Sequence, residues 1–288
     1  MGFFKTLFGS AEKDADEQAQ NDRLRDFDVL KYDGIRALQM GRADYAIQCF
    51  EHALDIADDF EVRDHLSRAL TRNNRLDDAF AQLSTMAEAQ PDNIAVLIRM
   101  AEIAYMNEDY DTVRSICERS AMEQSDNPLP SMMAAKAERG AGNIALAIEK
   151  LDKALTLDET FGDARLLRAQ YLIDSGRREE AYADADLLLQ AAPENEDVLL
   201  LCARLRAADG KNDEALYYYN KVIDVDPFNT VCLQERAALR KLLGDEAGAN
   251  DDLQTLAELM PEGDAGQAED LQQKVQEAYK NNNPFGLG

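Results

Sequence analysis

Apolar residues recur along this chain at helical spacing, in paired stretches separated by a short polar turn. One stretch before Gly210 places four apolar residues on one helical face: Val198, Leu199, Cys202 and Leu205. The next stretch repeats the pattern before Pro227: Leu216, Tyr219, Val222 and Ile223. Neither helix could bury its apolar face alone. The pattern therefore predicts helical hairpins that stack on one another.

A ladder of small residues repeats this hairpin. Its members are evenly spaced after a slightly shorter first step: Ala46, Ala79, Val113, Ala147, Ala181, Ala215 and Ala249. Five residues before each member is a turn column: Gly41, Asn74, Glu108, Gly142, Gly176, Gly210 and Gly244. Twelve residues before each member is a second small column: Gly34, Ser67, Ala101, Ala135, Ala169, Ala203 and Ala237. Twelve residues after each member is a stop column: Asp58, Pro91, Ser125, Glu159, Pro193, Pro227 and Pro261. Small residues permit close helix packing, glycine permits the turn, and proline ends the second helix.

This register resembles the tetratricopeptide repeat, a helix–turn–helix of about 34 residues. Seven units fit it, at about 27–59, 60–93, 94–127, 128–161, 162–195, 196–229 and 230–263. The chain contains no tryptophan, and the family's aromatic opening position holds leucine in four units: Leu30, Leu97, Leu199 and Leu233. The resemblance implies an all-α, right-handed α-solenoid in which the first helix of each unit lines the concave side.

The two ends differ from the repeats. Residues 1–26 form an apolar segment followed by a polar linker, and residues 264–280 carry an apolar stripe in a polar frame: Ala268, Leu271, Val275 and Tyr279. A terminal unit needs such a helix to cover its exposed face, so we expect a C-terminal capping helix there. Residues 281–288 have no periodicity, and we expect a flexible tail.

Charge and motifs narrow the functional classes. The formal net charge is −25, and no basic cluster exists to neutralise phosphates, so we expect no nucleic-acid partner. The four cysteines (Cys49, Cys117, Cys202 and Cys232) lack ligand spacing, and the two histidines (His52 and His65) lie in different predicted helices. We therefore expect no metal site and no cofactor. No phosphate loop, dinucleotide fingerprint or hydrolase motif occurs, so we expect no enzyme.

The resemblance instead assigns function to the concave side, where family members usually bind an extended peptide or a partner's helix. Register places ten candidate partner-binding residues there: Ile98, Glu102, Tyr105, Met132, Lys136, Leu166, Gln170, Ile173, Leu200 and Arg204. An apolar row beside polar groups would suit a peptide groove, but the same residues could pack between neighbouring helices. The set that grips acidic chaperone tails in some relatives is incomplete, because Ile35, His65 and Ala95 replace its amide and lysine residues.

Three functional interpretations remain open. The first is a non-catalytic protein-interaction scaffold that binds a peptide or helix of an unidentified partner. The second is a peripheral membrane adaptor anchored by residues 1–10, through Phe3, Phe4, Leu7 and Phe8. The third is a structural subunit of a larger assembly. The sequence shows neither a secretory signal nor a membrane-spanning stretch, so we expect a cytoplasmic protein.

Overall fold

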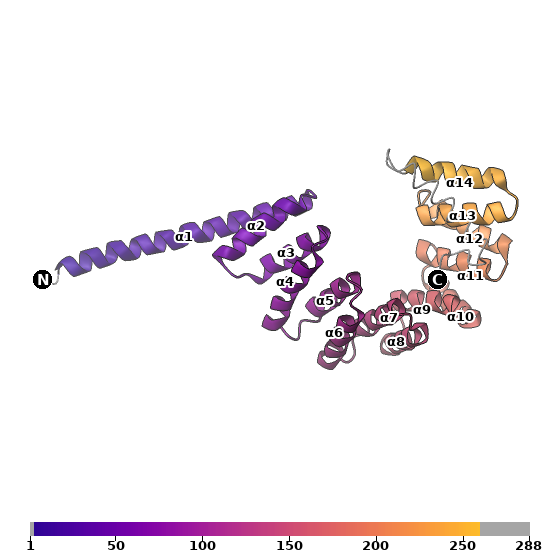
Figure 1. The fold of residues 1–288 in the computed structure, drawn as a ribbon, viewed down its shortest axis with the longest axis horizontal. Helices are drawn as coiled ribbons and strands as arrows, with labels where there is room; N and C mark the ends of the chain where they lie inside the picture. Colours follow the sequence, from indigo (N-terminus) through magenta and orange to yellow (C-terminus); the bar gives the residue numbers. More distant parts are fainter. Residues whose placement is uncertain (1–2, 260–288) are drawn as a thin grey trace. The chain divides into compact units, whose positions relative to one another are not determined.

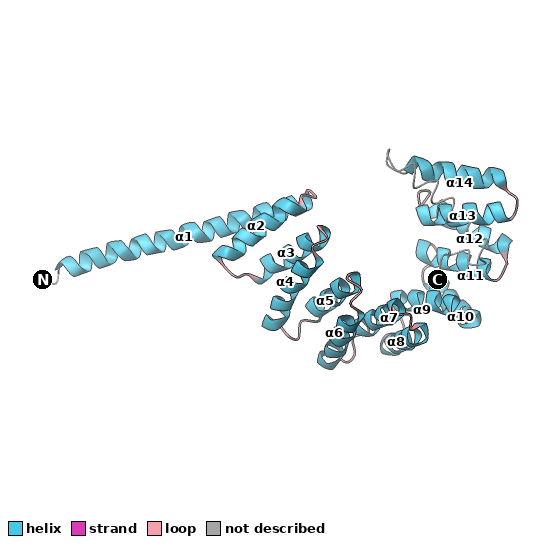
Figure 2. Ribbon diagram, in the orientation of Figure 1, coloured by secondary structure: helices cyan, strands magenta, loops and turns pink. Residues whose placement is uncertain are grey.

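The structure is a computed structural model that describes residues 3–259. These residues contain fourteen helices and no strand (Figures 1 and 2). The all-α prediction is therefore confirmed. The chain divides into two compact units between Asn143 and Ile144.

The first unit is built from seven helices in succession. They are α1 (Phe3–Gln39), α2 (Ala43–Ile56), α3 (Phe60–Arg72), α4 (Leu76–Ala89), α5 (Ile94–Met106), α6 (Tyr110–Glu123) and α7 (Leu129–Gly140). Each helix contacts the next, and α5 also contacts α7. Neighbouring first helices of the hairpins therefore touch directly at that point.

The second unit continues the pattern with seven more helices. They are α8 (Ile144–Leu157), α9 (Gly162–Asp174), α10 (Arg178–Ala191), α11 (Glu196–Ala208), α12 (Asn212–Val225), α13 (Thr230–Leu242) and α14 (Glu246–Leu259). Hairpins form from α9–α10, α11–α12 and α13–α14, and α9 also contacts α11.

The small-residue ladder lies where the predicted register puts it. Every ladder residue is at most 2% exposed, and every member of the column twelve residues earlier is buried. A Cβ atom added at Gly34 would lie 2.5 Å from the ring of Phe50. A larger side chain at Gly34 would push α1 away from Phe50 on α2, so this position sets the spacing within the first hairpin.

Turns and caps also follow the register. All seven residues of the turn column have positive φ, including the non-glycine residues Asn74 and Glu108, each at 57°. Several first helices have an N-cap residue whose side-chain oxygen accepts a hydrogen bond from the backbone N–H three residues later. These residues are Asp59, Asn93, Asn195 and Asn229. The last residue of each of α2, α4, α6, α8, α10 and α12 lies two positions before the corresponding position of the stop column.

The ends depart from the regular hairpin. Helix α1 starts at Phe3, so it runs through the predicted apolar segment and polar linker of residues 1–26 and extends well past α2 (Figure 1). Its first buried side chain among those described is Phe27. No helix of the described residues is long and apolar enough to cross a membrane. The predicted capping helix at 264–280, the tail at 281–288 and Pro261 lie outside the described residues.

Candidate functional site

The ten candidate residues all lie on first helices, as the register predicts, and they form two groups. In the first unit, α5 carries Ile98, Glu102 and Tyr105, and α7 carries Met132 and Lys136. In the second unit, α9 carries Leu166, Gln170 and Ile173, and α11 carries Leu200 and Arg204. The direct contacts of α5 with α7 and of α9 with α11 bring each group together.

The apolar row formed by Ile98, Met132, Leu166 and Leu200 is mostly packed away from solvent. Ile98 and Met132 are 9% exposed and Leu200 is 7% exposed. Leu166 and Ile173 on α9 remain partly exposed, as does the ring of Tyr105 on α5. Of the apolar candidates, these three therefore offer surface to a partner, while the buried three stabilise the contact between neighbouring first helices.

Arg204 is held by a partner that the sequence analysis missed. Its Nε lies 3.0 Å from both carboxylate oxygens of Glu235 on α13, and its Nη2 lies 2.6 Å from Oε1. The hydroxyl of Tyr219 donates to the same carboxylate at 3.1 Å. Burial alone would lower the pKa of Arg204, but the hydrogen bonds and charge of Glu235 outweigh it and raise the pKa. Arg204 thus links α11 to α13.

Ion pairs link first helices in the first unit as well. Lys31 on α1 lies 2.6 Å from Glu61 on α3. The guanidinium of Arg99 on α5 pairs with Asp64 on α3, which also accepts from Arg68 at 2.9 Å. Of the other polar candidates, Lys136 and Gln170 are partly exposed and Glu102 is exposed.

Charge is unevenly divided between the two helix types. The first helices of the hairpins from α3 to α13 carry 13 basic and 9 acidic residues, whereas the second helices from α2 to α14 carry 6 basic and 22 acidic residues. Of those 22 carboxylates, only Asp184 and Asp252 are buried. The second helices therefore have an excess of 16 acidic residues (22 against 6 basic), and most of their carboxylates lie on the surface.

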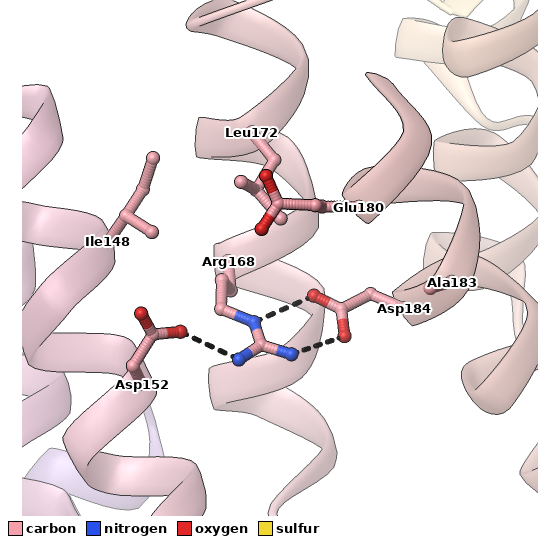
Figure 3. Close-up of a pocket in the computed structure, with 7 residues that line it drawn as sticks. All are labelled: Ile148, Asp152, Arg168, Leu172, Glu180, Ala183 and Asp184. Carbon is pink, nitrogen blue, oxygen red and sulfur yellow. Dashed lines mark hydrogen bonds and ion pairs between the residues drawn. The ribbon is translucent and has the colours of Figure 1, made fainter. Parts of the chain in front are cut away.

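A cavity of about 190 Å³ opens between α8, α9 and α10 in the second unit (Figure 3). Its lining is Ile148, Asp152, Arg168, Leu172, Glu180, Ala183 and Asp184. Arg168 crosses it, with Nε 2.8 Å and Nη2 2.6 Å from the two oxygens of Asp184, and with Nη1 2.7 Å from Asp152. The hydrogen bonds to Asp184 raise the pKa of Arg168 and keep it charged.

The cysteines and histidines form no reactive cluster in the described part of the chain. All four cysteines are free and buried, and burial raises the pKa of Cys117 and of Cys232 to about 12. The ring of His65 stacks on Phe50 with centroids 5.7 Å apart. Among the side chains that the structure describes, no three from His, Cys, Asp or Glu are grouped to hold a metal ion.

Comparison with known proteins identifies the fold. No family model matches the sequence, and no curated protein matches it. Among solved structures, a tetratricopeptide repeat protein from Parabacteroides merdae is 16% identical, with a TM-score of 0.68 over 86% of this chain and 97% of that one. PilW, a widely conserved type IV pilus biogenesis factor, is 20% identical, with a TM-score of 0.62 over 75% of this chain and 98% of its own.

A third solved structure agrees with these two. Pseudomonas aeruginosa pilF is 19% identical, with a TM-score of 0.54 over 72% of this chain and 94% of its own. Together with the helix pairs and the repeat register, these likenesses show that the chain has the tetratricopeptide repeat fold.

Proposed function

We propose that this protein is a non-catalytic interaction scaffold that binds a peptide or helix of a protein partner on its first helices. The observation that carries the proposal is the surface of α9, where Leu166, Gln170 and Ile173 remain partly exposed beside α11. Apolar side chains next to an amide group can bury area and fix the orientation of a bound segment. In the first unit, Tyr105, Glu102 and Lys136 offer a similar mixture on α5 and α7.

The distribution of charge between the two helix types also favours binding on the first helices. Second helices present twenty exposed carboxylates, and a dense set of like charges is costly to desolvate when a partner covers it. The first helices from α3 to α13 carry 13 basic and 9 acidic residues and are partly apolar, so a segment with apolar anchors gains more by binding there.

Photo-crosslinking tests the proposal directly. A photoreactive amino acid is introduced at Ile173, and the matched control carries it at Tyr217, which is 54% exposed on the second helix α12. In cells that express the full chain, we expect one defined crosslinked protein from position 173 and none from position 217. The crosslink should disappear when Leu166→Asp is added. Crosslinking from Tyr217 alone would move the interface to the second helices and contradict the proposal.

A further inference from the structure

The cavity between α8, α9 and α10 combines a buried floor with an exposed acidic rim. Ile148, Leu172 and Asp184 are each only 2% exposed, whereas the side chains of Asp152 and Glu180 are more than half exposed. Figure 3 shows the Glu180 carboxylate beside Leu172, with Arg168 between Asp152 and Asp184. At about 190 Å³ the cavity is smaller than a typical small-molecule site. It is large enough for one side chain.

The same polar arrangement occurs two repeats later in this unit. There, Arg236 takes the place of Arg168, Asp252 that of Asp184 and Asn220 that of Asp152. Arg236 Nη2 lies 2.6 Å from Asp252, and its Nη1 lies 2.8 Å from Asn220. The α12–α13–α14 group is therefore an internal reference for the α8–α9–α10 group.

The two groups differ at the position of the cavity. Leu172 corresponds to Arg240, and Glu180 corresponds to Gly248. The guanidinium of Arg240 donates from Nη1 to Asp252 at 2.9 Å and to the carbonyl oxygen of Gly248 at 3.0 Å. In α13–α14, a second arginine of the chain itself thus spans the place that Leu172 and Glu180 border in α9–α10.

We propose that the α8–α9–α10 cavity receives an arginine side chain of a partner protein, at the place that Arg240 occupies in the later repeat. The aliphatic stem of the incoming arginine packs on Ile148 and Leu172, and its guanidinium pairs with the carboxylate of Glu180, the residue that corresponds to the Gly248 contact of Arg240. Glu180 is held at present by Arg177, an exposed neighbour three residues away, whose Nε and Nη2 lie 2.7 and 2.6 Å from the two carboxylate oxygens. The incoming guanidinium takes over one of these oxygens, which costs little because both side chains are solvent-exposed.

The exposed side chains around the cavity carry both charges. Glu149, Glu179 and Asp186 are carboxylates on α8 and α10, and Lys153 and Arg178 are basic residues on the same helices. The preference for a cation therefore rests on the Glu180 carboxylate at the rim and on the place of Arg240 in the later repeat. This site lies between α8, α9 and α10, includes residues of both second helices, and is independent of the α9–α11 surface proposed above.

Methyl NMR with a defined probe tests the inference. N-acetyl-L-arginine methylamide is titrated to millimolar concentration into the full chain, and the Ile148, Leu172 and Ala183 methyl signals are followed. The citrulline analogue, which has the same shape without the charge, is the matched probe. We expect the arginine probe to shift these three signals in a saturable manner and the citrulline probe to leave them unchanged. Equal shifts with both probes, or none with arginine, would overturn the proposal.

Three variants locate the binding site of the arginine probe. Glu180→Gln removes one rim charge from an exposed position, and we expect it to weaken binding of the arginine probe by about threefold to tenfold. Glu179→Gln, on the adjacent residue outside the cavity, is the control and should leave the affinity unchanged. The double substitution Leu172→Arg and Glu180→Gly copies the later repeat and should abolish the shifts because the cavity is then filled. An undiminished affinity in Glu180→Gln would also contradict the proposal.

Discussion

Glu108 adopts the left-handed backbone conformation that Gly176 adopts at the corresponding turn of the second unit, with φ of 57° against 76°. Glycine enters this region without steric cost, whereas a Cβ atom makes it unfavourable by about 1–2 kcal/mol. The repeat imposes this conformation on the turn even where the residue type opposes it.

Glu108→Gly should therefore stabilise the protein by about 1 kcal/mol, because it removes the cost of the Cβ atom in the left-handed region. Gly176→Ala should destabilise it by a similar amount. A Cβ atom at Gly176 would meet no other atom within 4 Å, so the backbone alone would account for that loss. Urea unfolding of both variants gives the two free energies. A stabilised Gly176→Ala variant would show that φ at this turn is not positive.

Close helix packing at Gly34 gives a second prediction. Gly34→Ala should destabilise the protein by about 1–3 kcal/mol, because the added Cβ atom would lie 2.5 Å from Cε1 and 2.8 Å from Cδ1 of the buried Phe50 ring. In a Phe50→Leu background the same substitution should cost less, since the ring that it would meet is gone. A double-mutant cycle measured by thermal unfolding isolates this coupling. Equal costs in both backgrounds would place the clash elsewhere.

The buried ion pair between Arg236 on α13 and Asp252 on α14 gives a third prediction. Asp252 is 3% exposed and accepts from Arg236 and Arg240. Asp252→Ala leaves the buried Arg236 guanidinium without its carboxylate partner and should destabilise the protein by about 3–5 kcal/mol. Replacing Asp252 together with its buried partner, as Arg236→Met with Asp252→Leu, should cost much less. This is because Arg240 keeps the Gly248 carbonyl oxygen at 3.0 Å and Asp245 at 3.7 Å. Denaturant unfolding of the single and the double variant gives the two free energies to be compared. A double variant as unstable as Asp252→Ala would show that the ion pair itself stabilises the fold.

The helix hairpins could be predicted from sequence because their geometry leaves few residue choices. Positions such as Gly34 and Ala181 hold small residues, and this choice recurs in every repeat except at Val113 in the third. The start of α1 could not be predicted in the same way. Most helix stability in proteins comes from packing of an apolar face, and the polar run at 11–22 has no such periodicity. Nothing in the pattern marks a helix that begins at Phe3.

The repeat register predicts which helices carry the candidate residues, but not how deeply each side chain is buried. A place in the repeat tells which helix carries Ile98, Met132 or Leu200, but not how closely the next first helix approaches. The pairing of Arg204 with Glu235 has a sequence signal, since opposite charges almost one repeat apart fall on neighbouring first helices. Another such signal is the spacing from Arg168 to Asp184, which recurs unchanged from Arg236 to Asp252.

Burial separates two substitutions that the sequence alone treats as equivalent. Met132→Asp should destabilise the fold by several kcal/mol, because Met132 is 9% exposed and an unpaired carboxylate there is costly to bury. Leu166→Asp should leave stability nearly unchanged and affect partner binding, because Leu166 is partly exposed. Thermal unfolding distinguishes them. A loss of stability in Leu166→Asp equal to that in Met132→Asp would show that the α9 surface is structural.

The N-terminal segment supports a final prediction about membranes. Burial of Phe3, Phe4, Leu7 and Phe8 could each contribute roughly 1.5–3 kcal/mol, and the start of α1 at Phe3 already orders the backbone. Only Lys5 among the first ten residues carries a basic side chain, while the chain as a whole has a net charge of −25 and is repelled by anionic lipid. We expect the full chain not to sediment with phosphatidylserine-containing vesicles at physiological salt. Deletion of residues 1–10 should leave the unfolding midpoint unchanged, because this segment precedes the repeat register, which begins at about residue 27. Strong sedimentation that disappears with this deletion would instead support the membrane-adaptor interpretation.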